Sequence, residues 1–353
     1  MHCDVDAFYP SCEIKRDPSL AGKPLIVGAD PKNGYGRGVV TSCSYEARKF
    51  GVRSGMPISQ AFKLCPPPTG IYVRPDFELY GHTSERVMDV LKKYADRFEQ
   101  TSIDEAYLDV SDRCRAFDDA ADLAKKLKTD LKQVEKLTVS VGVAPNKSVA
   151  KMASDIQKPD GLTVVRPEQL IQFLDPLPVD KISGVGKKTG EFLRQHGIET
   201  IAQLRNTPAK TLTDWFGKGG VWLWGIANGI EETPVEERPL RKSISVEQTF
   251  EHDIQNKRVV REAIDALIQE VHERLLAEKL LFRTIGIKIR FGRGFETFTR
   301  EKTHTGWVDD PLVIRDYVNS LYREFEKDSR SIRLVGVRLS DLKPATGRQI
   351  TLA

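Results

Sequence analysis

The sequence has no long apolar run. None of its hydrophobic stretches approaches the roughly 18 residues that a membrane-spanning helix requires. The chain opens on a mixed segment, residues 1–6, that lacks the basic and apolar regions of a secretory signal peptide. Both absences argue against membrane insertion and secretion, so we expect a cytoplasmic protein that does not bind membranes.

Cysteine is scarce and unpatterned. The five cysteines are an odd set with no C-x-x-C spacing, which indicates neither a disulfide framework nor a zinc site. All of them fall in the first third of the chain: Cys3, Cys12, Cys43, Cys65 and Cys114. We therefore expect reduced thiols. Internal repeats and low-complexity tracts are also absent, so boundaries between domains must come from shifts in pattern.

Neither sign of charge dominates. The chain has 353 residues, of which 40% are hydrophobic and 29% charged, enough for a buried core and for two to four domains. Its 54 basic and 50 acidic side chains leave a net charge of +4. Residues 241–353 hold this whole excess, with 21 basic against 17 acidic side chains. That imbalance is a weak indication that the C-terminal part contacts an anionic partner.

The first half of the chain alternates between strand and helix patterns. A Gly- and Pro-rich insertion, residues 17–75, interrupts it after the first strand and helix. We expect strands at 2–6, 106–110, 138–143 and 162–165, and a further strand that ends near residue 102. We expect helices at 76–95 and 116–133, and a short helix that begins at Lys147. This order predicts a mixed α/β unit, residues 1–165, with an inserted subdomain.

The second half divides into three parts. Residues 166–232 have only short helical patterns, broken at Gly184, Gly186, Gly197 and 217–220. Residues 233–242 contain two prolines and dense charge without periodicity, as in a linker. The remainder, 243–353, reads strand, helix, strand, strand, helix, strand, the β-α-β-β-α-β order of a ferredoxin-like fold.

Acidic residues gather at two points of the α/β unit. Asp4 and Asp6 belong to the first strand, and Asp104 and Glu105 precede the strand at 106–110. Neighbouring strands could bring Asp4, Asp104 and Glu105 together, and such crowding is costly unless a cation lies between them. Ligands that are all oxygen favour Mg²⁺ or Mn²⁺. Taken singly, each acidic pair is more readily explained as solvated surface or turn residues.

Four segments then identify a family. Residues 4–9 (DVDAFY), 44–52 (SYEARKFGV), 102–109 (SIDEAYLD) and 151–161 (KMASDIQKPDG) resemble, in order and spacing, the Y-family translesion DNA polymerases of the DNA polymerase IV branch. The resemblance runs through the whole chain. It implies an α+β right-hand polymerase with a ferredoxin-like palm and small fingers (1–165), a helical thumb with a helix-hairpin-helix (166–232), a linker (233–242) and a little-finger domain (243–353).

The resemblance also implies a catalytic site. Carboxylates matching Asp4, Asp104 and Glu105 hold two Mg²⁺ ions, which Mn²⁺ can replace, and the carbonyl of Val5 completes the shell of one ion. The primer 3′-hydroxyl attacks the α-phosphate of a dNTP, and pyrophosphate leaves. We do not assign Asp6 as a ligand.

Five residues are expected at the nucleotide. Tyr45 and Arg48 lie three apart on a helix that begins near Ser44, so both can reach the triphosphate. Lys158 resembles the lysine that closes this cradle. Tyr9 matches the steric gate that excludes a 2′-hydroxyl, with Phe8 beside it as a core aromatic. Without the surrounding strings, Arg48 would read as a solvated helix face. Small residues, Ala7 and 41–43, would form a loose roof over the base pair.

Sequence-independent contacts with DNA are expected in two places. Residues 182–187 (ISGVGK) resemble the hairpin of a helix-hairpin-helix, in which Gly184, Gly186 and Lys187 approach a phosphate. They are not a G-x-x-x-x-G-K-[ST] loop, because residue 181 is lysine. In the last domain the expected phosphate contacts are Arg241, Lys242, Arg333 and Arg338. The alternative for these residues is ordinary surface solubility. The tryptophans at 215, 222 and 224 are expected in the thumb core.

The predicted function is low-fidelity, template-directed DNA synthesis past lesions by a monomer. Its partners are primer-template DNA and dNTP. The four regions leave no room for a proofreading exonuclease. Relatives usually end in a tail that binds the sliding clamp. No such tail is evident at residues 350–353, which leaves two alternatives, that it is absent or that it has been removed, and the clamp stays a possible partner. Two other classes are a DNA-binding scaffold without synthesis and a nucleotidyl cyclase or similar transferase on the same palm.

Overall fold

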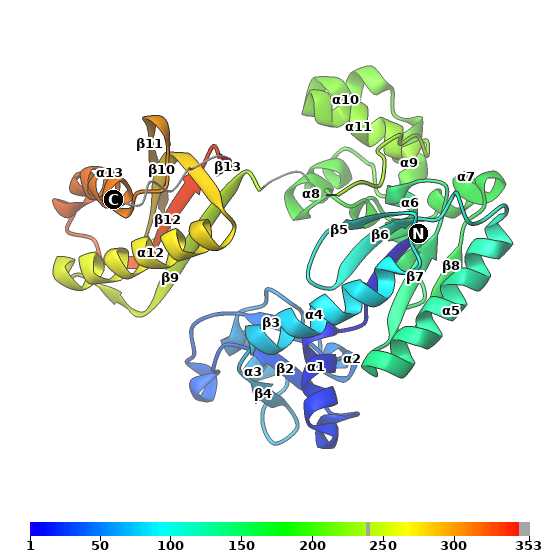
Figure 1. Cartoon of the computed structure of the whole chain (residues 1–353), viewed down its shortest axis with the longest axis horizontal. Helices are drawn as coiled ribbons and strands as arrows, with labels where there is room; N and C mark the ends of the chain where they lie inside the picture. The colour runs from blue at the N-terminus through cyan, green and yellow to red at the C-terminus, as the bar shows by residue number, and fades with distance from the viewer. Residues whose placement is uncertain (238–240, 346–353) are drawn as a thin grey trace, which may run out of the picture. The chain divides into compact units, whose positions relative to one another are not determined.

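The computed structural model describes residues 1–237 and 241–345. The chain forms two compact units, Met1–Arg238 and Pro239–Ala353 (Figure 1). Within the described residues, no helix combines the length and the apolar character that crossing a bilayer requires. All five cysteines are free, in accordance with the expected reduced thiols.

A five-stranded sheet forms the centre of the first unit. Its strand order is β5-β6-β1-β7-β8, and every pair is antiparallel except β7 with β8. The strands are β1 (His2–Val5), β5 (Arg97–Gln100), β6 (Glu105–Asp109), β7 (Val139–Val143) and β8 (Leu162–Val164). With β1 and β6 inside and β5 and β7 flanking them, the order is ferredoxin-like, as predicted for the palm. β8 extends the sheet at one edge.

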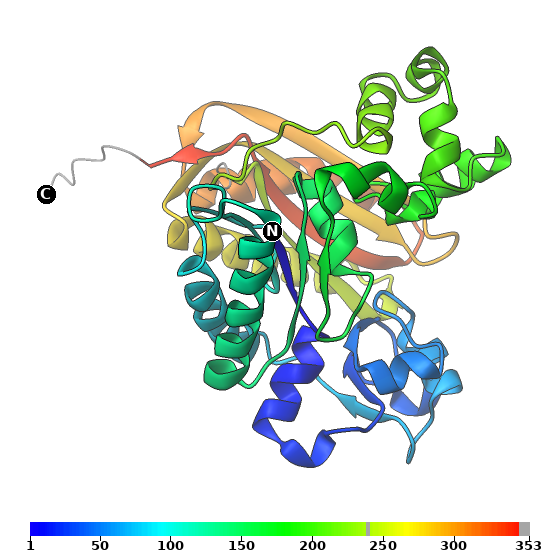
Figure 2. The same ribbon diagram turned by 90° about the vertical axis from the view of Figure 1, so that its right-hand side faces the viewer.

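Helices cover both faces of this sheet. α4 (Phe77–Lys92) and α5 (Phe117–Glu135) pack on one face, where Cys3 and Val5 join the main apolar core (Figure 2). α6 (Lys147–Ser154) packs against β1, β7 and β8. It lies so close to β7 that a Cβ on Gly142 would be 2.0 Å from the Ala150 carbonyl oxygen. Because side chains alternate along a strand, His2 and Asp4 point to the face opposite Cys3 and Val5.

The insertion predicted at 17–75 is a small subdomain with its own sheet. It follows α1 (Phe8–Arg16), and its strand order is β3-β2-β4. The elements are β2 (Leu25–Gly28), β3 (Val40–Cys43), α2 (Tyr45–Lys49), α3 (Ile58–Leu64) and β4 (Ile71–Val73), with short 3₁₀ turns at Pro18–Leu20 and Lys32–Gly34. A separate apolar cluster includes Ile26, Val40 and Ile58.

Four of the thiols are divided between these two cores. Cys3 and Cys12 belong to the main core, whereas Cys43 and Cys65 belong to the core of the insertion. Burial raises the pKa of Cys3 and of Cys12 to about 12, and it also raises the pKa of Cys43 and of Cys65. These buried thiols therefore remain protonated at neutral pH.

Short helices follow β8, as predicted. They are α7 (Leu170–Leu174), α8 (Lys187–Gln195), α9 (Ile201–Asn206), α10 (Ala209–Phe216) and α11 (Lys218–Ala227), with 3₁₀ turns at Pro167–Gln169 and Val179–Lys181. Their core also contains Val149 and Met152 of α6, so this region is packed onto the central sheet through α6. The break predicted across 217–220 is too long, because α11 already begins at Lys218. Trp222 is 40% exposed, so its prediction as a core residue is wrong.

The chain leaving α11 is bonded back to the beginning of α6. Asn146 Nδ2 donates to the Gly229 carbonyl oxygen at 2.9 Å, and Ser148 N donates to Glu231 Oε2 at 2.7 Å. Lys147 Nζ reaches the Pro234 carbonyl oxygen at 3.3 Å. A carboxylate at a helix N-terminus is favoured by the helix dipole. The first residues of the predicted linker are therefore attached to the first unit.

The second unit has the predicted element order. Its elements are β9 (Ser243–Ile254), α12 (Lys257–Ala277), β10 (Leu280–Phe291), β11 (Thr297–Val308), α13 (Pro311–Glu326) and β12 (Ile332–Ser340), followed by β13 (Lys343–Pro344), which pairs with β10. The strand order is β11-β10-β12-β9. The second and fourth strands are thus internal, whereas a ferredoxin-like sheet has the first and third inside, so that prediction is wrong for this sheet.

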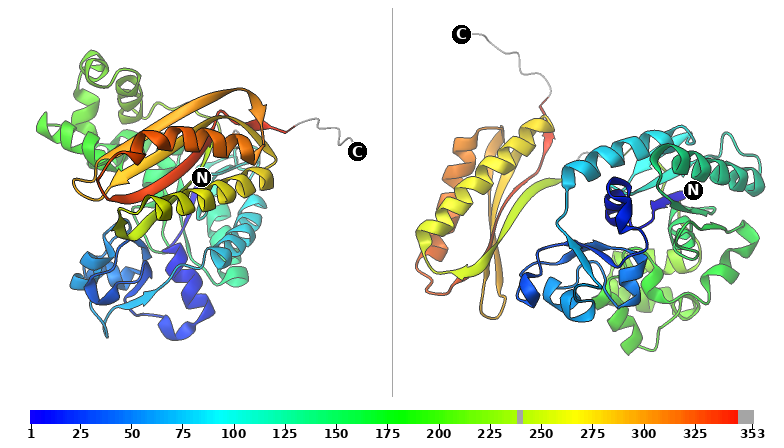
Figure 3. Two further views of the ribbon diagram at one scale, coloured as in Figure 1. Left: turned by 90° about the vertical axis from the view of Figure 1, so that its left-hand side faces the viewer. Right: turned by 90° about the horizontal axis from the view of Figure 1, so that it is seen from below.

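One face of the second sheet carries both helices. α12 and α13 lie side by side on it (Figure 3). Their apolar residues and those of the four strands make one core, which includes Phe282, Ile287 and Val337. No helix of this unit's described residues covers the other face. On this open face, Gly286 of β10 lies opposite Arg338 of β12, and Lys288 of β10 lies opposite Gly336 of β12.

Candidate active site and nucleic-acid interface

A cavity of about 330 Å³ lies between the central sheet and the insertion. Every residue predicted for catalysis, metal or nucleotide lines this cavity, except Glu105: Asp4, Val5, Phe8, Tyr9, Tyr45, Arg48, Asp104 and Lys158. Thr41 and Ser42 of β3 also line it, whereas Cys43 is buried in the core of the insertion and takes no part in the expected roof. Segments that are distant in the sequence thus meet at one site.

Strand pairing brings the acidic residues together. In the antiparallel pair of β1 and β6, Asp4 lies directly opposite Glu105, so the two side chains share the face that α6 covers. Val5 N donates to the Asp104 carbonyl oxygen at 2.9 Å, which fixes the turn before β6 beside the end of β1. The two acidic segments, a hundred residues apart in the chain, are therefore neighbours in space.

Each of the three carboxylates is held through one oxygen by a protein group. Asp4 Oδ2 lies 2.8 Å from Lys158 Nζ, and Ser102 Oγ donates to Asp104 Oδ1 at 2.5 Å. Glu105 Oε2 pairs with Lys151 Nζ and lies 3.4 Å from His2 Nε2. No hydrogen bond reaches the second oxygen of any of them from the described chain. In this arrangement, the described residues contain no group of three acidic, histidine or cysteine side chains positioned to hold a metal ion.

The pKa values of the three carboxyl groups at the site are shifted in different directions. Burial raises the pKa of Asp4 to about 6, opposed by Lys158 and assisted by the charges of Asp104 and Glu105. Burial also raises the pKa of Asp104. By contrast, His2 and then Lys151 lower the pKa of Glu105 to about 2 despite its burial. Strand pairing brings the three acids close together, and like charges at such a distance repel one another.

The donors present fit a hard divalent cation. The three carboxylates supply only oxygen, the ligand type that Mg²⁺ and Mn²⁺ prefer. Each keeps one oxygen without a partner among the described residues, and Asp4 and Asp104 both face the cavity. A cation between them would relieve their mutual repulsion, which adds to the effect of burial on the pKa of Asp4.

Tyr9 stands in the cavity wall within a group of aromatic rings. Its ring lies on that of Tyr80, with centroids 4.3 Å apart and planes inclined by 15°. Phe77 meets Tyr9 edge-on at 6.2 Å. Tyr80 is fully buried, and its hydroxyl donates to Glu13 Oε1 at 2.6 Å. Phe8 lies in the main core, as predicted.

Tyr45 and Arg48 lie together on α2, whose N-cap is Ser44. The guanidinium carbon of Arg48 is 4.5 Å from the centre of the Tyr45 ring. Burial, and then the charge of Asp6, raises the pKa of the Tyr45 hydroxyl to about 12, so it remains a proton donor. Tyr45 and Arg48 thus line the cavity side by side, while the Tyr45 hydroxyl donates to Asp6 Oδ1 at 3.3 Å.

Asp6 has a role that its sequence position does not suggest. It is 2% exposed and accepts hydrogen bonds from Ser140 Oγ at 2.7 Å, Asp160 N at 2.8 Å and Tyr45 Oη at 3.3 Å. These partners come from β7, from the turn after Lys158 and from the insertion. Asp6 therefore joins three parts of the site rather than facing the cavity.

The hairpin at 182–187 has the geometry of a tight turn before a helix. Val185 N donates to the Ile182 carbonyl oxygen at 2.9 Å, and Gly186 is the N-cap of α8. Gly184 has φ +101°, and a Cβ there would lie 3.0 Å from Trp222 Cη2. Gly186 has ordinary backbone angles and open space where its Cβ would be. The exposed Lys187 follows it.

The basic residues of the second unit lie in different surroundings. Arg338 is exposed on the open face of the sheet, between β10 and β9. The guanidinium of Arg333 covers the ring of Phe295 at 4.7 Å. Arg241 pairs with Glu278 at 3.1 Å, and Lys242 is exposed. Arg338 is the one of the four that stands on the flat, helix-free face.

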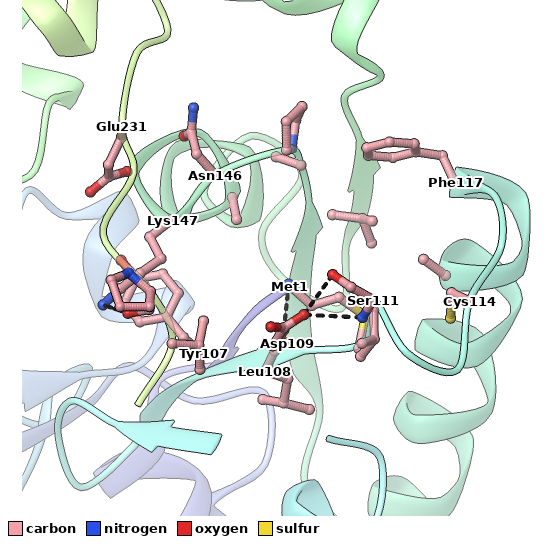
Figure 4. Close-up of a pocket in the computed structure, with 18 of the residues that line it drawn as sticks. Met1, Tyr107, Leu108, Asp109, Ser111, Cys114, Phe117, Asn146, Lys147 and Glu231 are labelled. Carbon is pink, nitrogen blue, oxygen red and sulfur yellow. Dashed lines mark hydrogen bonds between the residues drawn. The ribbon is translucent and has the colours of Figure 1, made fainter. Parts of the chain in front are cut away.

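A larger cavity, about 520 Å³, lies at the other end of β1 and contains none of the predicted site residues. Figure 4 shows Met1 at its base, with Asp109, Ser111 and Phe117 around it. The Met1 amine donates to the Leu108 carbonyl oxygen at 2.7 Å. Charged side chains also line this cavity, among them Asp109, Lys147 and Glu231, but none of them belongs to the predicted site.

Several residues of the site were not singled out from the sequence. Ser102, Lys151 and Tyr80 each hold one of the predicted residues, and Asp6 was set aside only as a metal ligand. Ser102 and Lys151 are the first residues of two of the matched strings, 102–109 and 151–161, so their position was a usable signal. Tyr80 offered none, since a buried aromatic on a helix is ordinary core.

Comparisons with known proteins agree over the whole chain. Residues 3–155 match the impB/mucB/samB family, 241–352 match the C-terminal domain of that family, and 167–198 match the IMS family HHH motif. A DNA polymerase IV of Methanoculleus marisnigri is 48% identical over 352 residues, which is 100% of this chain and 96% of the relative. A DNA polymerase IV of Clostridioides difficile is 41% identical, covering 100% of this chain and 96% of the relative.

Solved structures show the same fold. The Y-family DNA polymerase chimera Dbh-Dpo4(243-245)-Dbh matches with a TM-score of 0.87 and 31% identity, covering 97% of this chain and 98% of that one. The insertion ternary complex of Dbh DNA polymerase matches with a TM-score of 0.69 and 29% identity, over 97% and 98% of the two chains.

Proposed function

This chain belongs to the impB/mucB/samB family of Y-family DNA polymerases, and from that premise we propose how it carries out DNA synthesis. It is a DNA-directed DNA polymerase of the translesion type. We propose that nucleotidyl transfer occurs in the 330 Å³ cavity, with two Mg²⁺ ions and without proofreading. The observation that carries the proposal is the convergence of Asp4, Asp104 and Glu105 beside Tyr45, Arg48 and Lys158.

Asp4, Asp104 and Glu105 would hold the ions, together with the carbonyl of Val5. When bound, such ions lower the pKa of the attacking 3′-hydroxyl and neutralise the departing pyrophosphate. The chain's own groups orient the nucleotide. Arg48 contacts the triphosphate, and the Tyr45 hydroxyl does so once its proton turns away from Asp6. Burial lowers the pKa of Lys158, but Asp4 and Asp155 together raise it by more, so Lys158 brings a permanent positive charge to the same phosphates.

Tyr9 would select the sugar by steric exclusion. Its ring cannot tilt away easily, because Tyr80 and Phe77 support it. A ribose 2′-hydroxyl would meet this supported ring, whereas a deoxyribose would not. The small side chains of Thr41 and Ser42 would leave the other side of the nascent base pair loosely packed, which suits damaged templates.

DNA would be held through its backbone. We propose residues 1–165 as palm and fingers, 166–232 as thumb, 233–242 as linker and 243–353 as little finger. The hairpin with Gly184, Gly186 and Lys187 would bind a phosphate through backbone amides. Arg241, Lys242, Arg333 and Arg338 would contact phosphates of the template. Residues 350–353, at which a clamp-binding tail was sought, lie outside the described residues.

Primer extension tests the proposal directly. A primed template, undamaged or with an abasic site, is incubated with dNTPs and Mg²⁺, and a parallel reaction contains a chelator. We expect extension on both templates with Mg²⁺ and none with chelator. Asp104→Ala should abolish extension while leaving duplex binding nearly unchanged, because the carboxylate acts on the cation rather than on DNA.

Asp122→Ala, on the exposed surface of α5, is the matched control and should extend normally. Full activity of Asp104→Ala, or of Glu105→Ala, would mean that these acids are structural and would refute the site. Binding of DNA without any extension by the unaltered protein would favour a scaffold instead of a polymerase.

A further inference from the structure

Glu105 and Lys151 form an ion pair that proposed metal binding must break. Lys151 lies on α6, above the sheet face that carries Asp4 and Glu105, and its Nζ contacts Glu105 Oε2. We propose that Lys151 is an internal counter-ion, which neutralises Glu105 before a divalent cation arrives and which that cation displaces. This inference rests on the proposed function, because it needs Glu105 to be a metal ligand.

The pair is partly shielded from water. The side chain of Lys151 is 27% exposed and that of Glu105 is 20% exposed. Charges at this depth are screened less than surface charges, so the pair contributes more than an exposed ion pair does. Losing the ammonium would leave Glu105 with His2 as its one remaining partner among the described residues. Asp4 would keep Lys158, so the protein without metal depends on Lys151 for the charge of Glu105 alone.

The contacts of Glu105 allow a metal ion to replace Lys151 in steps. Lys151 Nζ and His2 Nε2 both face Oε2 of Glu105, and no described residue donates a hydrogen bond to Oε1. An incoming cation can bind Oε1 while Oε2 still contacts the ammonium. The lysine then withdraws toward solvent, which its partial exposure allows. Glu105 thus need not pass through a state with no counter-ion.

Asp4 has an equivalent partner. Lys158 Nζ lies 2.8 Å from Asp4 Oδ2 and 2.8 Å from Asp155 Oδ1. Two of the three acids therefore carry an ammonium group, and the third is held by the neutral hydroxyl of Ser102. Lys158 also belongs to the proposed triphosphate cradle, so its substitution would change two properties together. Lys151 has no such second role and is the residue to test.

The chain provides a matched control one turn earlier on the same helix. Lys147 Nζ pairs with Glu99 Oε2 at 2.5 Å, and both side chains are 14% exposed. This pair is at least as shielded as the first, but neither of its members is a proposed metal ligand. Loss of Lys147 therefore reports the effect of removing a lysine from α6, without an effect on the proposed metal ligands.

The experiment titrates the full-length protein with Mn²⁺ in the absence of DNA and nucleotide. Bound Mn²⁺ is measured by electron paramagnetic resonance, and the thermal unfolding midpoint is recorded at each concentration. Without metal, Lys151→Gln and Lys147→Gln should both unfold at lower temperature than the unaltered protein. With metal, Lys151→Gln should bind Mn²⁺ roughly three- to tenfold more tightly, where tenfold corresponds to about 1.4 kcal/mol.

Lys147→Gln should bind Mn²⁺ as the unaltered protein does, and Lys151→Arg should restore the weaker binding because it keeps the positive charge. Equal or weaker Mn²⁺ binding by Lys151→Gln would overturn the inference. So would the absence of saturable binding in both proteins, because removal of the ammonium should open the site. Tight binding that survives Asp104→Ala would instead refute the metal site of the proposed function.

Discussion

The ring of Tyr9 is stacked on the ring of Tyr80, with 4.3 Å between their centroids. The two residues belong to α1 and α4, on either side of the insertion in sequence. Tyr80 is itself fixed by burial and by its hydrogen bond to Glu13. The proposed gate therefore owes its rigidity to a residue that never touches the nucleotide.

Replacing Tyr80 should weaken sugar discrimination. Tyr80→Leu keeps an apolar side chain but removes the flat support, which is worth about 0.5–1.5 kcal/mol for an aromatic pair. We expect the ratio of kcat/KM for dNTP to that for rNTP to fall about two- to tenfold. Tyr80→Phe, which keeps the stack, is the control and should discriminate normally. A Leu variant as selective as the unaltered protein would show that Tyr9 needs no support.

Substitution by valine should have different effects at the two hairpin glycines, Gly184 and Gly186. Gly186→Val meets open space at an ordinary backbone conformation, so it should weaken binding to every DNA sequence alike without lowering the thermal unfolding midpoint. Gly184→Val should also destabilise the fold by about 1–2 kcal/mol, because φ is +101°. Fluorescence anisotropy with several unrelated duplexes measures the binding. A loss confined to one sequence would contradict a grip on the backbone.

Arg338 should bind a phosphate from the open face of the second sheet. Arg338→Ala should weaken binding of primer-template DNA and reduce the slope of log affinity against log salt by about 1. Arg323→Ala is the comparison, because Arg323 is exposed on α13, which covers the opposite face. Both are measured over a series of salt concentrations. Equal effects of the two substitutions would mean that only net charge matters.

Asp6 should matter for stability more than for chemistry. Asp6→Ala leaves three buried or half-buried donors without their acceptor, so the free energy of unfolding should fall by about 2–4 kcal/mol. Asp17→Ala, which removes only an exposed cap, should cost about 1 kcal/mol or less. Urea unfolding monitored by circular dichroism compares them. A loss below that of the control would contradict the role of Asp6.

The elements of the fold could be predicted because periodicity is local. The alternation along 106–110 predicted β6, and the Gly- and Pro-rich stretch predicted the insertion, since both signals lie in the residues themselves. The strand order of the second sheet could not be read in this way. An identical β-α-β-β-α-β order is compatible with either pair of internal strands, and packing between distant residues decides which one forms.

The candidate site, too, could be predicted only in part. The matched strings predicted a set of acids and cations for the site, and in the structure all of them except Glu105 line one cavity. The partners of those acids depend on which face of the sheet α6 covers. That choice places Lys151 on Glu105 and Lys158 beside Asp4, and no spacing in the sequence specifies it. The role of Asp6 likewise follows from β1 ending at Val5, which turns the next carboxylate out of the strand.

The four buried thiols allow local opening of the protein to be measured through their reactivity. A protonated, enclosed thiol does not react with an alkylating reagent until its surroundings open. Cys3 and Cys12 would record opening of the main core, and Cys43 and Cys65 opening of the insertion. Timed alkylation followed by peptide mass spectrometry can therefore separate the motions of the two regions in the unlabelled, unmutated chain.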